Sequence, residues 1–104
     1  MAYRVELTRS AERELQALYD RVSAEDSAAG QSWFNGLEEA IFSLEQLPHR
    51  CPVASESKIW GRTLRHLIYG AKHSVYRVIY EIDDARRLVR IRNVRHGAMD
   101  EFNP

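Results

Sequence analysis

The feature that most constrains the fold of this chain is a period-two pattern near its C-terminal end. Tyr76, Val78, Tyr80 and Ile82 occupy every second position of one run. Side chains of a β-strand alternate between the two faces of a sheet, so this run predicts a strand with one apolar face. Further strand-like runs precede and follow it, at residues 62–69 and 88–95, across short polar turns. Short links between successive strands predict an antiparallel meander.

The first half of the chain has the helical period instead. After a short alternating run at residues 3–7, apolar residues recur at helical spacing over residues 10–24, with Ser10 as the expected N-cap. A second stripe begins after Ser27, another expected cap, and continues to Pro48. Two amphipathic helices with so short a link predict a hairpin. The expected class is therefore α+β, in the order β-α-α-β-β-β, as an antiparallel sheet with the hairpin packed on one face and the other face open to solvent.

Length and composition exclude several classes of protein. At 104 residues the chain is expected to form one domain, residues 1–104. No apolar run approaches the ~20 residues that cross a bilayer, and the start of the chain has no signal-peptide core, so we expect a cytoplasmic protein. Cys51 is the only cysteine, which excludes an internal disulfide and a thiolate metal cluster. We expect no metal, no cofactor and no membrane partner.

The formal net charge of zero conceals a division of charge along the chain. Residues 1–48 hold 4 basic and 9 acidic residues, whereas residues 49–104 hold 11 basic and 6 acidic ones, so the halves carry −5 and +5. Thirteen of the 15 cations are arginines, which can bind a phosphate or carboxylate through two N–H groups at once. The second half either binds an anionic partner or neutralises the first half within the fold.

Strand parity predicts which basic side chains share the open face of the sheet. The apolar row of the middle strand should face the helices, which places Arg77 on the open face. Residues 62–69 leave a choice between Arg65 and His66 for the same face. In the last strand Val89 and Ile91 should face the core, so three more side chains join the open face, the last of them only if no bulge intervenes: Arg90, Arg92 and His96.

An imidazole among guanidiniums suggests chemistry on a phosphate. The imidazole could move a proton at neutral pH while the arginines neutralise charge, as cleavage of RNA through its own 2′-OH requires. Glu56, in the long loop at residues 48–61, is the nearest candidate for a second acid or base. Each residue also has a structural interpretation: a solvated arginine paired with Glu81, a histidine bonded to backbone, or an exposed loop carboxylate.

Three segments of the chain, residues 7–15, 76–80 and 94–97, together with the expected element order, resemble one known group. The chain resembles the RelE/ParE superfamily, the toxins of bacterial type II toxin-antitoxin modules. The resemblance spans nearly the whole chain and implies a cognate antitoxin protein as partner. It also implies one of two targets. RelE-like members, including the YoeB and HigB types, are ribosome-dependent mRNA endonucleases, whereas ParE-like members inhibit DNA gyrase.

The resemblance also implies roles for particular residues. In a nuclease, Arg77 would hold the scissile phosphate and His96 would act as the acid or base, while Glu56 loosely matches a loop carboxylate of those members. Neighbouring arginines would bind nucleic acid or the protein target: Arg65, Arg90, Arg92 and Arg95.

The departures from the nuclease pattern favour the other branch. Gly97 follows His96 where nucleases often have a tyrosine, and the tail holds only Phe102, which has no hydroxyl. RelE-type members use lysines ahead of the middle strand, whereas this chain has only Lys58 and Lys72. The expected function is therefore a toxin that inhibits DNA gyrase in the ParE manner. The alternative is an mRNA endonuclease, and a further alternative is a non-toxic nucleic-acid-binding or interaction module.

Overall fold

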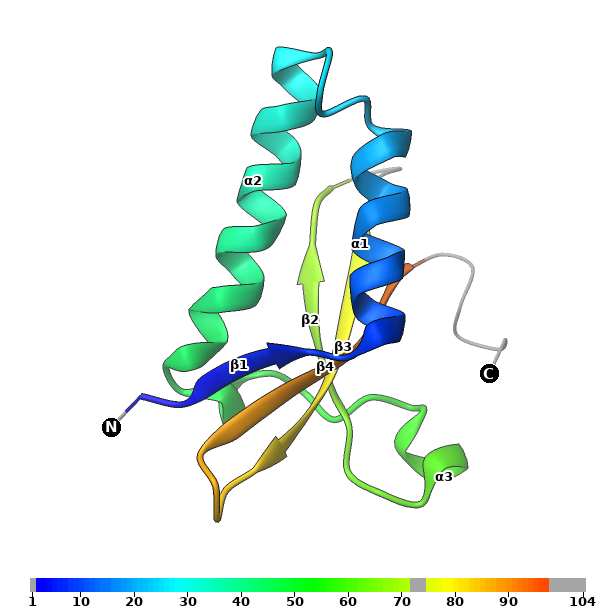
Figure 1. Cartoon of the computed structure of the whole chain (residues 1–104). Coiled ribbons are helices and arrows are strands. Elements are labelled where there is room, and N and C mark those ends of the chain that lie inside the picture. Colours follow the sequence, from blue (N-terminus) through cyan, green and yellow to red (C-terminus); the bar gives the residue numbers. More distant parts are fainter. Residues whose placement is uncertain (1, 72–74, 98–104) are drawn as a thin grey trace.

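The computed structural model describes residues 2–71 and 75–97, which form a four-stranded sheet with two long helices on one face (Figure 1). Lys72 and His73 of the expected turn at residues 70–73, Ser74 at the start of the expected middle strand, and the tail residue Phe102 lie outside the described part. The strands, in the spatial order β1-β4-β3-β2, are β1 (Arg4–Leu7), β4 (Leu88–His96), β3 (Tyr76–Asp83) and β2 (Arg65–Tyr69). The helices are α1 (Arg9–Arg21), α2 (Ala28–Phe42) and α3 (Ser57–Trp60), with 3-10 turns η1 (Ser43–Glu45) and η2 (Pro48–Arg50).

Both long helices begin at a hydroxyl side chain. Thr8 caps α1 in place of the expected Ser10, because Thr8 is the last extended residue after β1 and Ser10 already lies within the helix. The Thr8 Oγ1 accepts a hydrogen bond of 3.2 Å from the Ala11 N–H. Ser27 caps α2, as predicted. α2 ends before the predicted stop at Pro48, since the chain tightens into η1 after residue 42.

The main core lies between the sheet and the helical hairpin. α1 packs over β4 and α2 lies nearer β2, so each apolar stripe faces the apolar row of the strands. The predicted α+β class and the predicted helix-facing row are confirmed. The largest side chains that are fully buried in this core are Leu37, Ile41, Leu44, Val78, Tyr80, Val89 and Ile91. None of the described helices is long and apolar enough to span a membrane.

The sheet is mixed, although it was expected to be antiparallel throughout. β2, β3 and β4 form the predicted antiparallel meander. β1 pairs with β4 in parallel. A meander reverses direction at each turn, so β4 runs in the same direction as β2, and β1, which shares that direction, extends the free edge of β4 as a parallel strand.

A β-bulge interrupts the pairing of β4 with β3. The register shifts between Ile79, which pairs with Asn93, and Tyr80, which pairs with Ile91. Arg92 is the inserted residue and has no pairing partner on β3. Because side chains alternate along a strand, one inserted residue moves every later side chain to the other face of the sheet. The prediction placed His96 on the open face only if no bulge intervened. Because a bulge does intervene, the end of β4 has the opposite parity, and no periodicity in the sequence marks the inserted residue.

β1 covers only the first part of the outer edge of β4, and a carboxylate from α1 covers some of the rest. Glu14 Oε1 accepts hydrogen bonds from the Val94 N–H at 2.9 Å and from Asn93 Nδ2 at 3.2 Å. Glu14 Oε2 lies 4.0 Å from Arg95 Nε. The Glu14 side chain thus takes the place of a strand partner beyond the end of β1.

Replacing Glu14 with alanine should lower the free energy of unfolding by about 1–3 kcal/mol, because the buried Val94 N–H loses its acceptor. Glu14→Gln keeps an oxygen at the Oε1 position and should lose less. Urea denaturation of the three proteins measures the difference. An equal loss in the two variants would contradict the hydrogen-bond explanation and assign the effect to the charge of Glu14.

The second face of the sheet is partly covered, whereas the sequence predicted an open face. Residues 51–64 cross this face, and Ala54 and Leu64 form a small second core with Ile79 of β3. Ser57 Oγ fastens α3 by accepting from the Leu64 N–H and donating to the Leu64 carbonyl. Ile79 is an apolar residue in the otherwise polar row of β3, and the open face predicted from the sequence would have left its side chain exposed to solvent.

Candidate functional site

Arg77 lies on the second face of the sheet, where β3 carries it beneath residues 51–64. Its side chain is only 7% exposed and forms a two-point contact with the Glu56 carboxylate, Nη1 to Oε2 at 2.6 Å and Nη2 to Oε1 at 2.7 Å. The hydrogen bonds from Arg77 lower the pKa of Glu56, although burial acts in the opposite direction. Arg77 was expected to be an open-face cation, but it is the buried partner of an ionised carboxylate.

His66 of β2 is the third member of this group. Arg77 Nε donates a hydrogen bond of 3.0 Å to His66 Nδ1. An arginine nitrogen can only donate, so Nδ1 carries no proton and the neutral ring has its proton on Nε2. Burial and the nearby Arg77 charge both lower the pKa of His66, and Glu56 only partly offsets them. The open choice between Arg65 and His66 is therefore settled in favour of His66.

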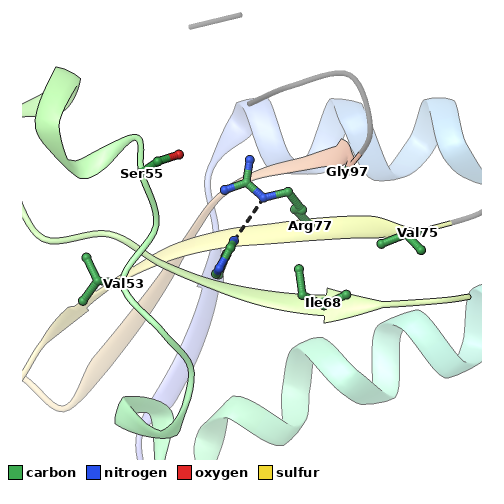
Figure 2. Close-up of a pocket in the computed structure, with 7 residues that line it drawn as sticks. Val53, Ser55, Ile68, Val75, Arg77 and Gly97 are labelled. Carbon is green, nitrogen blue, oxygen red and sulfur yellow. Dashed lines mark hydrogen bonds between the residues drawn. The ribbon is translucent and has the colours of Figure 1, made fainter. Parts of the chain in front are cut away.

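A hollow of about 400 Å³ opens beside Arg77. In Figure 2 the Arg77 side chain rises from β3 toward the segment that carries Val53 and Ser55, and Ile68 and Val75 line the wall. The dashed line there is the bond to His66. The hollow combines apolar walls with a guanidinium and a neutral imidazole, a composition typical of a site for a small or extended polar ligand.

His96 lies on the other face of the sheet. Its ring packs edge-on against Tyr76, with 5.2 Å between the ring centroids, and it borders a shallow hollow with Leu18 and Arg21 of α1. His96 was expected to share a surface with Arg77 only in the absence of a bulge, and it does not share one, because the bulge at Arg92 reverses the parity of the end of β4. The sheet itself therefore separates the His96 imidazole from Arg77.

Arg65 also lies on the helix-covered face, where its guanidinium binds backbone carbonyl groups. Its Nη1 donates to the carbonyl oxygens of His49 at 3.3 Å and Cys51 at 2.7 Å. Tyr80 binds the same stretch of chain, since its buried hydroxyl donates to the Pro48 carbonyl at 2.6 Å. These contacts give Arg65 a structural role in fastening residues 48–51 to the sheet.

Arg90 and Arg92 lie on the second face, as predicted, and converge on one carboxylate. Arg90 Nη1 and Arg92 Nη2 donate to Glu81 Oε1 at 3.1 and 3.0 Å, and Arg62 Nη1 donates to Oε2 at 3.0 Å. Burial alone would raise the pKa of Glu81, but the hydrogen bonds from Arg92 and Arg62 lower it. Arg62 was not among the predicted site residues, although it begins the strand-like run at residues 62–69; in the structure it precedes β2. Arg95 joins this face through the bulge.

The lowered pKa values of His66 and Glu56 predict that the fold loses stability in acid. The unfolded chain protonates His66 near its ordinary pKa of 6.5 and the folded chain only at lower pH, so stability falls as the pH drops through this interval. The Glu56 contribution is present above its ordinary pKa of 4.5 and is lost as the pH falls through its lower folded value. Thermal melts from neutral to acidic pH test both steps. In His66→Asn the upper step should shrink relative to the wild-type protein, and an unchanged upper step would contradict its assignment to His66.

Comparisons with known proteins agree with this architecture. A family model described as "ParE toxin of type II toxin-antitoxin system, parDE" matches residues 5–101. The RelBE2 toxin-antitoxin complex from Mycobacterium tuberculosis is similar at 26% identity, with a TM-score of 0.60 and 94% of each chain covered. The chromosomal ParDE system from P. aeruginosa is similar at 16% identity, with a TM-score of 0.68 and coverage of 91% of this chain and 96% of that one. A mutant of the E. coli toxin RelE in the free state is similar at 15% identity, with a TM-score of 0.59 and coverage of 98% and 92%. No match was found among curated proteins.

The mixed sheet, the helical hairpin on one face and the loop across the other define the fold of the RelE/ParE superfamily of toxins. Within that class, the family model covers nearly the whole chain. The chain belongs to the family of ParE toxins of type II toxin-antitoxin systems. The resemblance stated from the sequence is thus confirmed at the level of the family.

Proposed function

We propose that this toxin acts by inhibiting DNA gyrase. The proposal rests on the separation of the two residues that a nuclease would need on one surface. Arg77 and His96 lie on opposite faces of the sheet, and the Arg77 guanidinium is bound by Glu56. The membership of the chain in the ParE family supports the same target, since the ParE-like branch that the sequence resembles is the gyrase-inhibiting one.

The test is a supercoiling assay with purified gyrase and relaxed plasmid. A stoichiometric excess of the toxin should block supercoiling or accumulate cleaved DNA, and His96→Ala should act like the wild-type protein. Unaffected supercoiling at that excess would contradict the proposal. Induced expression in bacteria without a partner is the companion test: filamentation supports gyrase as the target, and normal growth supports a non-toxic binding module instead.

Ribosome-dependent cleavage of mRNA is the second candidate, and the hollow beside Arg77 is the observation that favours it. A phosphate could enter this hollow if Glu56 released Arg77. The tautomer of His66 weighs against acid-base catalysis, because the lone pair on Nδ1 is already engaged by Arg77. Toe-printing on translating ribosomes decides the matter. We expect no new mRNA ends, whereas new ends that appear with the wild-type toxin, and not in its absence, would establish the nuclease.

We also propose a cognate antitoxin as the partner of this chain. The RelBE2 structure from Mycobacterium tuberculosis, similar at 26% identity, is a toxin-antitoxin complex. A hollow of about 420 Å³ between α1 and α2 combines apolar residues such as Leu15, Tyr19 and Phe34 with polar and acidic ones such as Glu12 and Glu38, a mixed surface suited to an amphipathic segment. Co-expression with the product of an adjacent short reading frame should restore growth and yield a complex. Two proteins that purify apart would contradict the pairing.

A further inference from the structure

Three arginines on the second face of the sheet share a single acceptor, Glu81. Arg90 and Arg92 come from β4 and Arg62 follows α3, so separate segments of the chain deliver the three guanidiniums to one carboxylate. We call these four residues the Glu81 cluster. Its formal charge is +2, because one carboxylate faces three cations. Arg4 and Glu6 of the neighbouring β1 pair with each other at 3.0 Å and leave this surplus unchanged.

The cluster holds more hydrogen-bond donors than Glu81 can satisfy. Within the described residues, the Nη2 groups of Arg62 and Arg90 make no hydrogen bond to protein, and Arg92 Nε is buried without a partner. The side chains of Arg62 and Arg90 are 51% and 32% exposed. Two guanidiniums with unused N–H groups at the surface are suited to phosphate oxygens, which accept hydrogen bonds from arginine in pairs.

An exposed aromatic residue lies two positions before Arg62 of the cluster in the chain. Trp60, at the end of α3, is 45% exposed and is separated from Arg62 by Gly61 alone, so their Cα atoms are at most about 7 Å apart. Trp60 and Arg95 border the same small hollow. The bulge at Arg92 is what brings Arg95 to this face, and it extends the row of cations along β4.

We propose that this surface binds a single-stranded nucleic acid, with backbone phosphates on Arg62 and Arg90 and a base stacked on Trp60. Excess positive charge attracts any polyanion, but the exposed indole distinguishes among them. A base offers a flat ring to stack on Trp60, whereas the side chain of an acidic peptide offers only its carboxylate. The site does not depend on gyrase as the target, since it is a property of the toxin alone.

Binding of a short fluorescently labelled DNA strand to the purified toxin at low salt tests the proposal through anisotropy. In Arg62→Gln/Arg90→Gln the affinity should fall about tenfold, and the slope of log K against log salt should decrease by roughly 1.4, about 0.7 for each phosphate contact. Glu81 keeps Arg92 as its partner in this variant, so the fold should survive. Trp60→Ala should weaken binding about tenfold, and Trp60→Phe should restore most of the loss.

The sharpest variant is Glu81→Gln, which should bind several-fold more tightly, because the cluster loses its internal anion. Damage to the fold cannot produce that gain. Arg9→Gln/Arg13→Gln is the matched control, since Arg9 and Arg13 are exposed arginines on α1, in the layer on the other side of the sheet, and the change removes the same number of charges. The proposal is overturned if the wild-type toxin does not bind the strand, if Arg9→Gln/Arg13→Gln loses as much affinity as Arg62→Gln/Arg90→Gln, if Glu81→Gln binds more weakly, or if an acidic peptide binds in place of the strand.

Discussion

Replacing Arg77 with methionine should lower the free energy of unfolding by about 3 kcal/mol or more. The Glu56 side chain is only 6% exposed, and its two oxygens lie 2.6 and 2.7 Å from the Arg77 guanidinium. Methionine fills much of the same space but leaves the carboxylate buried without its counter-charge, and breaking a buried ion pair in this way typically costs 3–5 kcal/mol. Urea denaturation at neutral pH measures the loss.

The double variant Glu56→Gln/Arg77→Met distinguishes the contribution of the ion pair to stability from that of side-chain packing. Removing both charges relieves the penalty of the unpaired carboxylate, so the double variant should recover much of the loss. The single variant should also regain stability as the pH falls toward the ordinary pKa of the carboxyl, 4.5, because a protonated Glu56 has no charge to bury. Equal losses in the single and double variants would contradict the account, and would assign the effect to the aliphatic part of Arg77.

The regular elements of this fold could be read from periodicity, because their side chains repeat at fixed spacing. The two helical stripes predicted the hairpin, and the apolar row of β3 predicted its core face. The predicted helix boundaries were less accurate. Thr8 and Ser10 can both cap a helix, and the position at which β1 ends determines which of them does so. The parallel pairing of β1 with β4 depends on contacts between distant segments, and no local pattern encodes it.

The candidate site could be predicted only in part, because one inserted residue decides its composition. Parity placed Arg77, Arg90 and Arg92 on one face correctly. Because of the bulge, Arg95 rather than His96 lies on that face. The ion pair between Glu56 and Arg77 could not be predicted from the sequence either, because a loop has no periodicity that indicates where a carboxylate will lie. Apolar residues in the strands, such as Ile79 of β3 and Ile68 of β2, were the available signal that something covers this face.

Truncating Leu37 to alanine should lower the free energy of unfolding by about 2–5 kcal/mol, which makes it the other large effect expected in this chain. Leu37 is fully buried in the middle of the apolar stripe of α2, among residues of the main core. The change removes apolar contacts and leaves a cavity that the packed hairpin cannot close. The midpoint of thermal unfolding should fall by on the order of 10–20 °C, which differential scanning calorimetry measures directly.

Glu38→Ala is the matched control, because Glu38 is the next residue of the same helix and is exposed. It should change stability by no more than about 0.5 kcal/mol. A Leu37→Ala protein that melts within a few degrees of the wild type would contradict the packing of α2 on the sheet. If the loss is as expected, growth inhibition by Leu37→Ala should depend on temperature, since only the folded toxin can act. Cells that express it should be arrested at low temperature and recover at a temperature above its melting point, while Glu38→Ala remains toxic at both.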